Sequence, residues 1–306
     1  MALPAISVVI NTRNEEGTVA GALQSVAPWA SEVIVVDMHS TDRTREIAAS
    51  FGARVFLHEE VGFADPARAF AVGQASCPWV LVLDADEVVP PPLAARLLAV
   101  AGADEADVVD IAWENYLLGR RFVGCGWGGG QDRHPRFFRR GSVLLSPQLH
   151  RYMVVRPGAR VLRLPAAAGL EVLHFNYRTC EHFMRKLDRY SGVRARQMPG
   201  TPGRWGGALA CLQAVREFLA RYFWRAGYRD GWRGLSLALL GASFHIAVFA
   251  KRWEAAEGLT DASVAAAYSR IAEVAIAGYS APGWGRRAPG EQGCGPGDGG
   301  VSCGSR

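Results

Sequence analysis

The stretch VLVLDADEVVP, residues 80–90, is the most informative about the fold, because four apolar residues run directly into a group of carboxylates. A short apolar run of this kind is typical of a buried strand. Asp84, Asp86 and Glu87 would then lie at the carboxyl end of that strand, where open α/β sheets bind their ligands. The stretch therefore predicts a strand that ends in an acidic site for a ligand that is cationic or carries a cation.

Similar apolar runs recur along the N-terminal half, and stretches with helical spacing separate them. The runs are AISVVIN (5–11), EVIVVD (32–37), ARVFL (53–57), ADVVDIAW (106–113) and PRFFRRG (135–141), and the helical stretches cover 17–26, 42–51, 66–75 and 91–100. This alternation predicts an α/β fold, in which helices flank a mostly parallel sheet. We expect Asn14 and either Ser40 or Thr41 to cap the first two helices.

The length of the chain and the spacing of its cysteines limit the class of protein to which it can belong. The chain has 306 residues, 49% of them hydrophobic, so it can bury a full core. Its six cysteines show no paired spacing, and no basic region precedes a long apolar core at the N-terminus. Neither a disulfide framework nor a secretory signal is therefore expected, and a reducing cytoplasm is the default environment.

Positive charge gathers in the C-terminal half. Residues 175–254 carry fourteen basic and five acidic side chains, a net charge of +9. Such a segment suits nucleic acid, anionic lipid or an acidic substrate, and composition does not choose among them. We expect a first domain at 1–178, a helical, basic, membrane-associating region at 179–280 and a disordered, Gly-rich tail at 281–306.

The stretch GLSLALLGASFHIAVFA, residues 234–250, has no formal charge and is bounded by Arg233 and Lys251. It lies at the short end of the roughly 17–25 residues that a spanning helix needs. A buried helix, an interfacial or re-entrant membrane helix and a true span all remain open. Arginines recur every four residues just upstream among aromatic residues, which favours a lipid headgroup layer unless Gly227 and Gly231 break that helix.

Polar side chains follow three of the expected strands. Thr12, Arg13 and Glu15 follow the strand expected at 5–11, and Asp37 ends the one expected at 32–37. Asp84 ends the apolar run that begins the stretch at 80–90. Each pattern alone also fits a solvated turn or a helix cap, but parallel strands bring their carboxyl ends to one edge of a sheet. Asp84 and Asp86, two positions apart, can both face that edge and hold Mg²⁺ or Mn²⁺, which favour oxygen ligands.

The blocks SVVINTRNEE, VIVVDMHSTDRT and WVLVLDADE, at these spacings, resemble the nucleotide-sugar-binding half of family 2 glycosyltransferases, which have the GT-A fold. Three later blocks are similar to the subgroup that adds sugars during lipopolysaccharide core assembly. They are GQDRHPRFFRRG (130–141), LEVLHFNY (170–177) and RAGYRDGWRGLSLAL (225–239). The resemblance covers roughly residues 5 to 255.

The resemblance implies an inverting transfer of a hexose from a nucleotide diphosphate sugar, expected to be UDP-linked, to a lipopolysaccharide-core or other lipid-linked acceptor. Its implied donor-binding residues are Thr12, Arg13, Glu15, Asp37, Arg68 and Asp84. Asp86, with Asp84, would ligate the metal ion. An inverting enzyme needs a general base for the acceptor hydroxyl, and we expect Asp132 in that role.

Several residues near these positions carry weaker expectations. His150 is a second candidate base, and Arg136 and Arg139 are candidates for stabilising a diphosphate or a phosphorylated acceptor. The chain departs from the subgroup at Ala69, where an amide is common, and at Arg151, where a His-Glu pair is common. Ala69 would remove one polar contact to the nucleotide or sugar of the donor. Arg151 would remove the acidic residue expected beside His150.

The alternatives belong to other classes. A non-catalytic, membrane-docked nucleotide-sugar-binding protein would keep the same strand ends without a working base. A sugar nucleotidyltransferase or a dinucleotide dehydrogenase would need a Gly-rich phosphate loop, which NTRNEEGTV does not provide. Nucleic acid is disfavoured because the arginines accompany an uncharged apolar helix. We expect a peripheral protein on an anionic membrane surface, at the cytoplasmic face of the inner membrane.

Overall fold

The computed structural model describes residues 3–59, 65–128, 130–145, 153–198, 200–277 and 279. The described residues as far as Ala256 form one compact unit, and those from Glu257 onward form a second. The second unit contains α8 (Asp261–Ala277). The tail expected at 281–306 lies outside the described residues, and the domain boundary expected after residue 178 stays a prediction.

The first unit is built on a mixed sheet whose strand order is β3-β2-β1-β4-β8-β6-β12-β5. In that order the strands are β3 (Arg54–Leu57), β2 (Glu32–Asp37), β1 (Ile6–Thr12), β4 (Trp79–Asp84), β8 (Arg133–Arg139), β6 (Val108–Leu117), β12 (Val172–Phe175) and β5 (Glu87–Val88). The first four are parallel, whereas β8 runs antiparallel to both β4 and β6. The predicted α/β fold is confirmed, with an antiparallel strand inserted beside β4.

Shorter strands complete the pattern. β7 (Arg120–Arg121) and β11 (Val161–Arg163) pair with β6, and β9 (Val143–Leu145) pairs with β10 (Met153–Val155) in a separate sheet. β12 is parallel to β6 and antiparallel to β5, so the chain just after Asp86 is tied to the far end of the sheet. This pairing brings the segment around residue 174 beside the acidic stretch.

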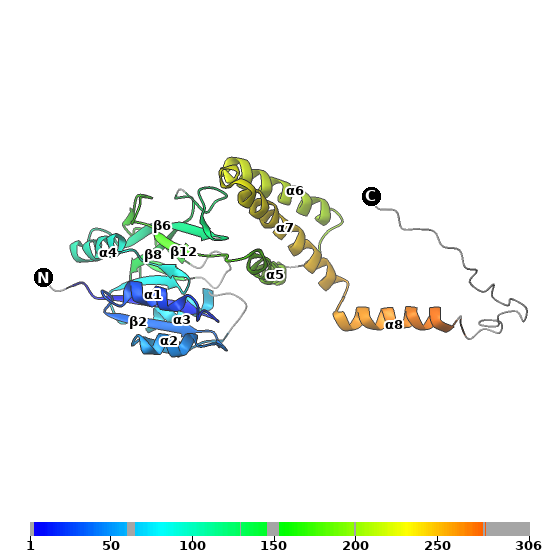
Figure 1. The fold of residues 1–306 in the computed structure, drawn as a ribbon, viewed down its shortest axis with the longest axis horizontal. Coiled ribbons are helices and arrows are strands. Elements are labelled where there is room, and N and C mark those ends of the chain that lie inside the picture. Colours follow the sequence, from blue (N-terminus) through cyan, green and yellow to red (C-terminus); the bar gives the residue numbers. More distant parts are fainter. Residues whose placement is uncertain are drawn as a thin grey trace, which may run out of the picture. The chain divides into compact units, whose positions relative to one another are not determined.

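Helices cover both faces of the sheet because successive residues of a strand point to opposite sides. Ile6, Val8 and Ile10 of β1 pack with α1 (Val19–Val26) and α4 (Pro91–Ala103), and α2 (Thr44–Ser50) joins that core. Val9 points to the other face, where α3 (Asp65–Gln74) packs. Figure 1 shows these helices around the sheet. β1 is therefore buried on both faces, as its continuous apolar sequence predicts.

The expected helix caps are wrong. The N-cap residues of α1 and α2 are Thr18 and Arg43. Asn14 instead donates its backbone N–H to Ser40 Oγ at 2.8 Å, and its Oδ1 accepts the backbone N–H of Thr41 at 2.8 Å. These polar residues bind the loop after β1 to the loop after β2, because both loops leave neighbouring parallel strands at the same edge.

Three helices follow the sheet within the first unit. They are α5 (Cys180–Gln197), α6 (Gly206–Leu219) and α7 (Gly231–Ala256), and α7 packs against both of the others (Figure 1). Thr179 caps α5 by accepting the backbone N–H of His182 at 3.1 Å. The turn between α6 and α7 has a π-helical segment (Ala220–Trp224) and a 3-10 segment (Gly227–Asp230). The arginines that recur every four residues from Arg221 to Arg233 therefore do not share one helix face, since they lie on different segments.

The Gly-rich stretch that begins at Gly124 packs against this turn. Asp230 accepts the backbone N–H groups of Val123 and Gly124, each at 2.9 Å. A Cβ atom at Gly124 would lie 2.3 Å from the carbonyl oxygen of Ala226, so only glycine fits there. The glycine at this point lets the turn between α6 and α7 pack closely onto the sheet region.

Candidate active site

The ends of β1, β2 and β4 meet at one edge of the sheet, as predicted. Thr12 pairs in register with Asp37, and Asn11 pairs with Asp84. Thr12 Oγ1 donates to Asp37 Oδ2 at 2.9 Å, and the backbone N–H of Ser40 donates to Asp37 Oδ1 at 2.8 Å. Asp37 is fully buried, so this carboxylate holds the two loops at the predicted nucleotide edge.

The other two residues of the first block differ in exposure. Arg13 is exposed, whereas Glu15 is half-buried and accepts a hydrogen bond from Thr18 Oγ1 at 2.7 Å. Burial raises the pKa of Glu15, and the negative charge of Asp86 raises it further. Glu15 therefore lies within electrostatic range of the acidic stretch after β4.

Two arginines neutralise Asp84. Arg68 Nη2 lies 2.6 Å and 2.7 Å from the two carboxylate oxygens, and Arg136 Nη2 lies 3.1 Å from Oδ2. Burial alone would raise the pKa of Asp84, but the charges of Arg136 and Arg68 outweigh it and hold that pKa far below its usual range. Arg68 and Arg136 are thus bound to the strand end where the sequence predicts donor binding.

Glu87 is the innermost carboxylate of the stretch, with 1% of its surface exposed. Its Oε1 accepts Trp113 Nε1–H at 2.6 Å, its Oε2 accepts the backbone N–H of Asp84 at 2.8 Å, and Arg136 Nη1 lies 3.3 Å from Oε2. Burial is the main reason that the pKa of Glu87 is raised. Its bonds fix the turn that presents Asp84 and Asp86.

Asp86 faces two basic groups that come from later in the chain. His174 Nε2 lies 3.6 Å and Lys186 Nζ 3.9 Å from Asp86 Oδ2. Burial would raise the pKa of Asp86, but the charge and hydrogen bond of His174 and the charge of Lys186 lower it. The carboxylate is therefore ionised, and the longer contact distances leave its lone pairs accessible to a closer ligand.

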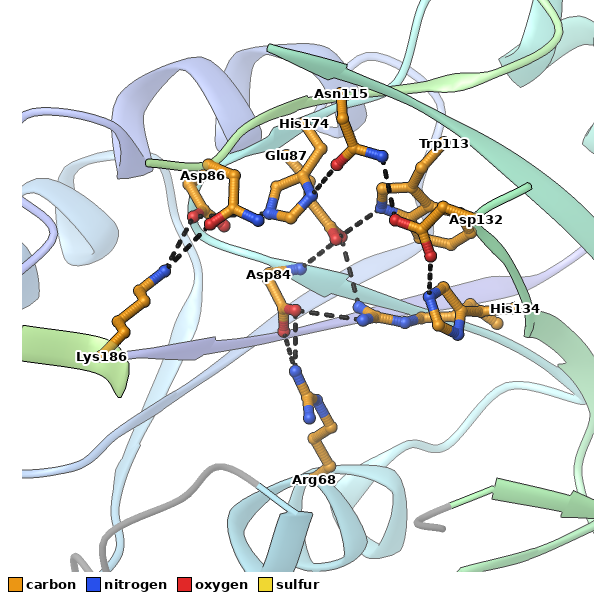
Figure 2. A network of polar contacts seen from close by, with 12 residues as sticks. Arg68, Asp84, Asp86, Glu87, Trp113, Asn115, Asp132, His134, His174 and Lys186 are labelled. Atoms are coloured by element: carbon orange, nitrogen blue, oxygen red, sulfur yellow. Dashed lines mark hydrogen bonds and ion pairs between the residues drawn. The ribbon is translucent and has the colours of Figure 1, made fainter. Parts of the chain in front are cut away.

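A buried amide connects Asp86 with the predicted base. Asn115 Nδ2 donates to the carbonyl oxygen of Trp127 at 2.8 Å and to Asp132 Oδ2 at 2.9 Å. Its Oδ1 lies 2.7 Å from His174 Nδ1, as Figure 2 shows. Because both amide protons are already used, Oδ1 is the acceptor and His174 carries a proton on Nδ1. The Nε2 of His174 is thereby aimed at Asp86.

Asp132, the predicted base, is held at both oxygens. His134 Nε2 lies 2.8 Å from Oδ1, and Asn115 donates to Oδ2 (Figure 2). Burial would raise the pKa of Asp132, but the hydrogen bond and charge of His134 and the hydrogen bond of Asn115 lower it. Asp132 is therefore an ionised carboxylate in the same polar network as Asp86.

The donor set around Asp86 fits a hard divalent ion that also binds substrate. Within the described ranges, no group of three or more His, Cys, Asp or Glu side chains forms a ready metal cage. Mg²⁺ commonly takes only one or two carboxylates together with substrate phosphates. Asp86 could serve in that mode, and its role as a metal ligand stays a prediction. Metal ligation by Asp84 stays a prediction, since Arg68 already engages both of its oxygens.

The weaker candidates are dispersed. Arg139 pairs in register with Trp79, at the opposite end of β4 from Asp84, and contacts Asp104 and Asp107 there. His150 and Arg151 lie outside the described residues. The sequence reasoning missed the roles of Asn115, His174 and Lys186. A signal existed for Asn115, a fully buried amide within the largely apolar strand β6.

This geometry agrees with the comparison to known families. Residues 7–150 match the family model described as glycosyl transferase family 2. This part of the chain is therefore similar to the family 2 glycosyltransferases. The match begins in β1 and takes in the three strand ends and Asp132.

Two relatives illustrate the extent of the similarity. An uncharacterized glycosyltransferase of Rickettsia typhi is 44% identical over 82 residues, which are 27% of this chain and 28% of that protein. The lipopolysaccharide core biosynthesis glycosyltransferase LpsC of Rhizobium meliloti is 27% identical over 257 residues, which are 81% of this chain and 92% of that protein. The similarity to LpsC thus extends beyond the family 2 domain into the helical region.

Solved structures show more distant similarity. S. aureus TarS is 15% identical, with a TM-score of 0.43, over 83% of this chain and 92% of that chain. Glucosyl-3-phosphoglycerate synthase from Mycobacterium tuberculosis, solved with Mn²⁺, uridine diphosphate and glucosyl-3-phosphoglycerate, is 27% identical over 38% of this chain and 45% of that chain, with a TM-score of 0.29.

Proposed function

We propose that the protein is a metal-dependent, inverting glycosyltransferase that moves a hexose from a nucleotide diphosphate sugar to a lipopolysaccharide-core or other lipid-linked acceptor. One observation carries this proposal: Asn115 and His174 join Asp132 and Asp86 in a single buried network. The family 2 domain and the similarity to LpsC, whose name assigns it to lipopolysaccharide core biosynthesis, support the reaction class and the acceptor class.

The donor would bind along the edge formed by β1, β2 and β4. Thr12, Arg13, Glu15 and Asp37 would surround the nucleotide, which we propose to be uridine diphosphate. Arg68, with Asp84, would lie near the ribose or the diphosphate. A Mg²⁺ or Mn²⁺ ion held by Asp86 would neutralise charge on the diphosphate.

Asp132 would accept the proton of the acceptor hydroxyl as that oxygen attacks the anomeric carbon. The bond between this carbon and the diphosphate breaks on the opposite face, so the configuration inverts and a nucleoside diphosphate leaves. The low pKa of Asp132 keeps it ionised and ready to accept a proton at neutral pH. Lys186, beside Asp86, adds positive charge near the leaving group.

The test is the release of nucleoside diphosphate from a panel of nucleotide sugars by the purified protein with Mn²⁺. We expect turnover of at least one UDP-hexose and no detectable turnover by Asp86→Ala. Glu46→Ala is the matched control, because that carboxylate is exposed on α2 and pairs only locally with Arg43. Saturable nucleotide-sugar binding without any turnover or transfer would favour the non-catalytic binding protein instead.

We also propose that the pair α6 and α7 docks on an anionic membrane surface. Each helix carries exposed apolar residues at spacings that place them on one helical face. They are Trp205, Leu209, Leu212, Val215, Leu219 and Phe223 on and around α6, and Trp232, Leu235, Leu239, Ile246 and Trp253 on α7. The exposed residues Trp224, Arg225 and Arg229 lie at the turn between them. Aromatic and arginine side chains together suit anionic headgroups.

The long helical stretch Gly227–Ala256 is apolar and long enough to cross a membrane, and only 28% of its most apolar window is buried. A peripheral position at the cytoplasmic face of the inner membrane and a spanning position differ in how the protein is extracted. Flotation with anionic vesicles, but not with neutral ones, and release by high salt are expected for the peripheral mode. Flotation abolished by duplex DNA at equal charge would point to nucleic acid.

A further inference from the structure

A cavity of about 340 Å³ lies between the sheet region and the helices α5, α6 and α7. Aromatic rings make up much of its wall. They belong to Trp127, Tyr177, Phe183, Tyr190 and Phe244. Its volume falls at the lower end of the range of about 300–1,000 Å³ that is typical of small-molecule sites, and such sites combine aromatic walls with a few polar groups.

The cavity adjoins the carboxylate network. Lys186 Nζ lies 5.2 Å from the centre of the Tyr177 ring and 3.9 Å from Asp86 Oδ2. On another wall, the carbonyl oxygen of Trp127 accepts a hydrogen bond from the same Asn115 amide that binds Asp132. Burial is the main reason that the pKa of Tyr177 is raised, and the charges of Asp86 and Asp132 add to it. The cavity wall and the two carboxylates are therefore connected through the neighbours that they share, Lys186 beside Tyr177 and Asn115 beside Trp127.

The polar groups of the wall restrict the class of ligand. Arg221 Nε donates to Glu217 Oε1 at 2.7 Å, and its Nη1 donates to the carbonyl oxygen of Cys125 at 3.1 Å. The guanidinium also lies 4.9 Å from the centre of the Trp127 ring. A phosphate would have to compete with these contacts for Arg221, and an acyl chain would leave buried charge against hydrocarbon.

A sugar ring fits such a wall better. Its C–H faces are apolar and pack on aromatic rings, while its hydroxyls reach polar groups at the edges, which here include Glu217 and His245. We propose that this cavity binds a sugar ring of the acceptor, at or next to the residue whose hydroxyl is attacked. This assignment rests on the proposed glycosyltransferase activity, because the acceptor is defined by that reaction.

The experiment separates the acceptor from the donor. The probe is the oligosaccharide released from lipopolysaccharide by mild acid hydrolysis, and its binding is followed by saturation-transfer NMR. Two variants alter the cavity in opposite directions: Phe244→Ala enlarges it, and Leu187→Trp fills it. Tyr268→Ala is the matched control, since that residue is 68% exposed and does not line the cavity.

We expect both cavity variants to raise the KM for the oligosaccharide about tenfold or more, the size of effect that loss of one good aromatic contact gives. Acceptor-independent hydrolysis of the donor should stay unchanged in both, which also shows that they are folded. The control should match the wild-type protein in both assays.

The inference is overturned if the wild-type protein shows no saturation transfer to the oligosaccharide, or if both variants keep the wild-type KM. Its failure is distinguishable from failure of the proposed function. Donor hydrolysis with normal acceptor kinetics in both variants would reject the cavity alone. Absence of donor hydrolysis by the wild-type protein would reject the enzyme, while the NMR measurement would still report on the cavity.

Discussion

The carboxyl edge of the sheet and the α6–α7 pair differ in the burial and pairing of their side chains. At the sheet edge, buried carboxylates are matched with arginines and histidines brought from distant segments. On α6, on α7 and at the turn between them, large apolar side chains stay exposed, such as Leu212 on α6 by 65% and Trp224 at the turn by 90%. The buried carboxylates of the first region have their partners within the chain. The exposed apolar side chains of the second region are available to a partner outside it.

The two regions are suited to different kinds of partner. A buried charge is tolerated only when it is paired, so the pairing at the sheet edge keeps a charged site in place before any ligand arrives. Exposed apolar stripes that extend over several helical turns mark an interaction surface. Under the proposed function, the sheet edge would carry the chemistry and the exposed faces of α6 and α7 the docking, so substitutions in one should leave the property of the other intact.

The largest expected effect is on turnover. Asp132→Asn keeps the shape of the side chain but removes the base, so kcat should fall about 10²–10⁴-fold while donor affinity is unchanged. Steady-state kinetics and calorimetric titration with the donor check both parts. Asp110→Asn, which changes a carboxylate paired with Arg133 on the neighbouring strand, is the control. A normal rate for Asp132→Asn would reject the assignment of the base.

The second prediction concerns the stability of the charged edge. Arg136→Met leaves Asp84 and Glu87 buried beside each other without their shared partner, which should lower the free energy of unfolding by about 3–5 kcal/mol. Arg139→Met removes a more exposed pairing with Asp104, which should lower it by about 1 kcal/mol or less. Urea denaturation of the two variants measures the contrast, and equal losses would show that burial does not govern these pairs.

The third prediction tests the bridging amide. Asn115→Leu removes the acceptor for His174 Nδ1–H and the donor to Asp132. We expect kcat to fall about 10–100-fold, which is the usual effect of losing a group that orients the ligands of a site. A purely structural role would leave the pKa of His174 unchanged. We expect a ¹⁵N NMR titration to give a lower pKa for His174 in the variant than in the wild-type protein, because the imidazolium loses the acceptor for its Nδ1–H.

The smallest expected effect is on membrane binding. Trp224→Ser together with Trp232→Ser should weaken binding to anionic vesicles about tenfold, because two large rings no longer enter the interface. Donor hydrolysis in solution should be unchanged, which keeps the two regions separate. Tyr268→Ser on α8, at a position 68% exposed, is the matched control. Loss of hydrolysis in the tryptophan variant would show that the two regions are coupled.

The sheet was predictable because each of its buried parallel strands is a continuous apolar run in the sequence. The bounds expected for β2, 32–37, agree with the structure, and the strand expected before the carboxylates is β4 (Trp79–Asp84), since buried parallel strands are continuous apolar runs. The convergence of Thr12, Asp37 and Asp84 followed from topology alone. The helix caps did not follow, because Asn14 and Ser40 use their polar atoms between loops, and such pairing depends on which strands are neighbours.

Residues close together in the chain were enough to predict the alternation of strands and helices, the acidic edge and the apolar helix after Arg233. The three-dimensional fold was needed to show which basic group neutralises each carboxylate, that Asn115 joins Asp132 to His174, and that Gly124 packs against Ala226. These contacts connect residues that are far apart in sequence. Burial makes a precise partner necessary for each charge, but the partner's identity depends on strand order and helix docking.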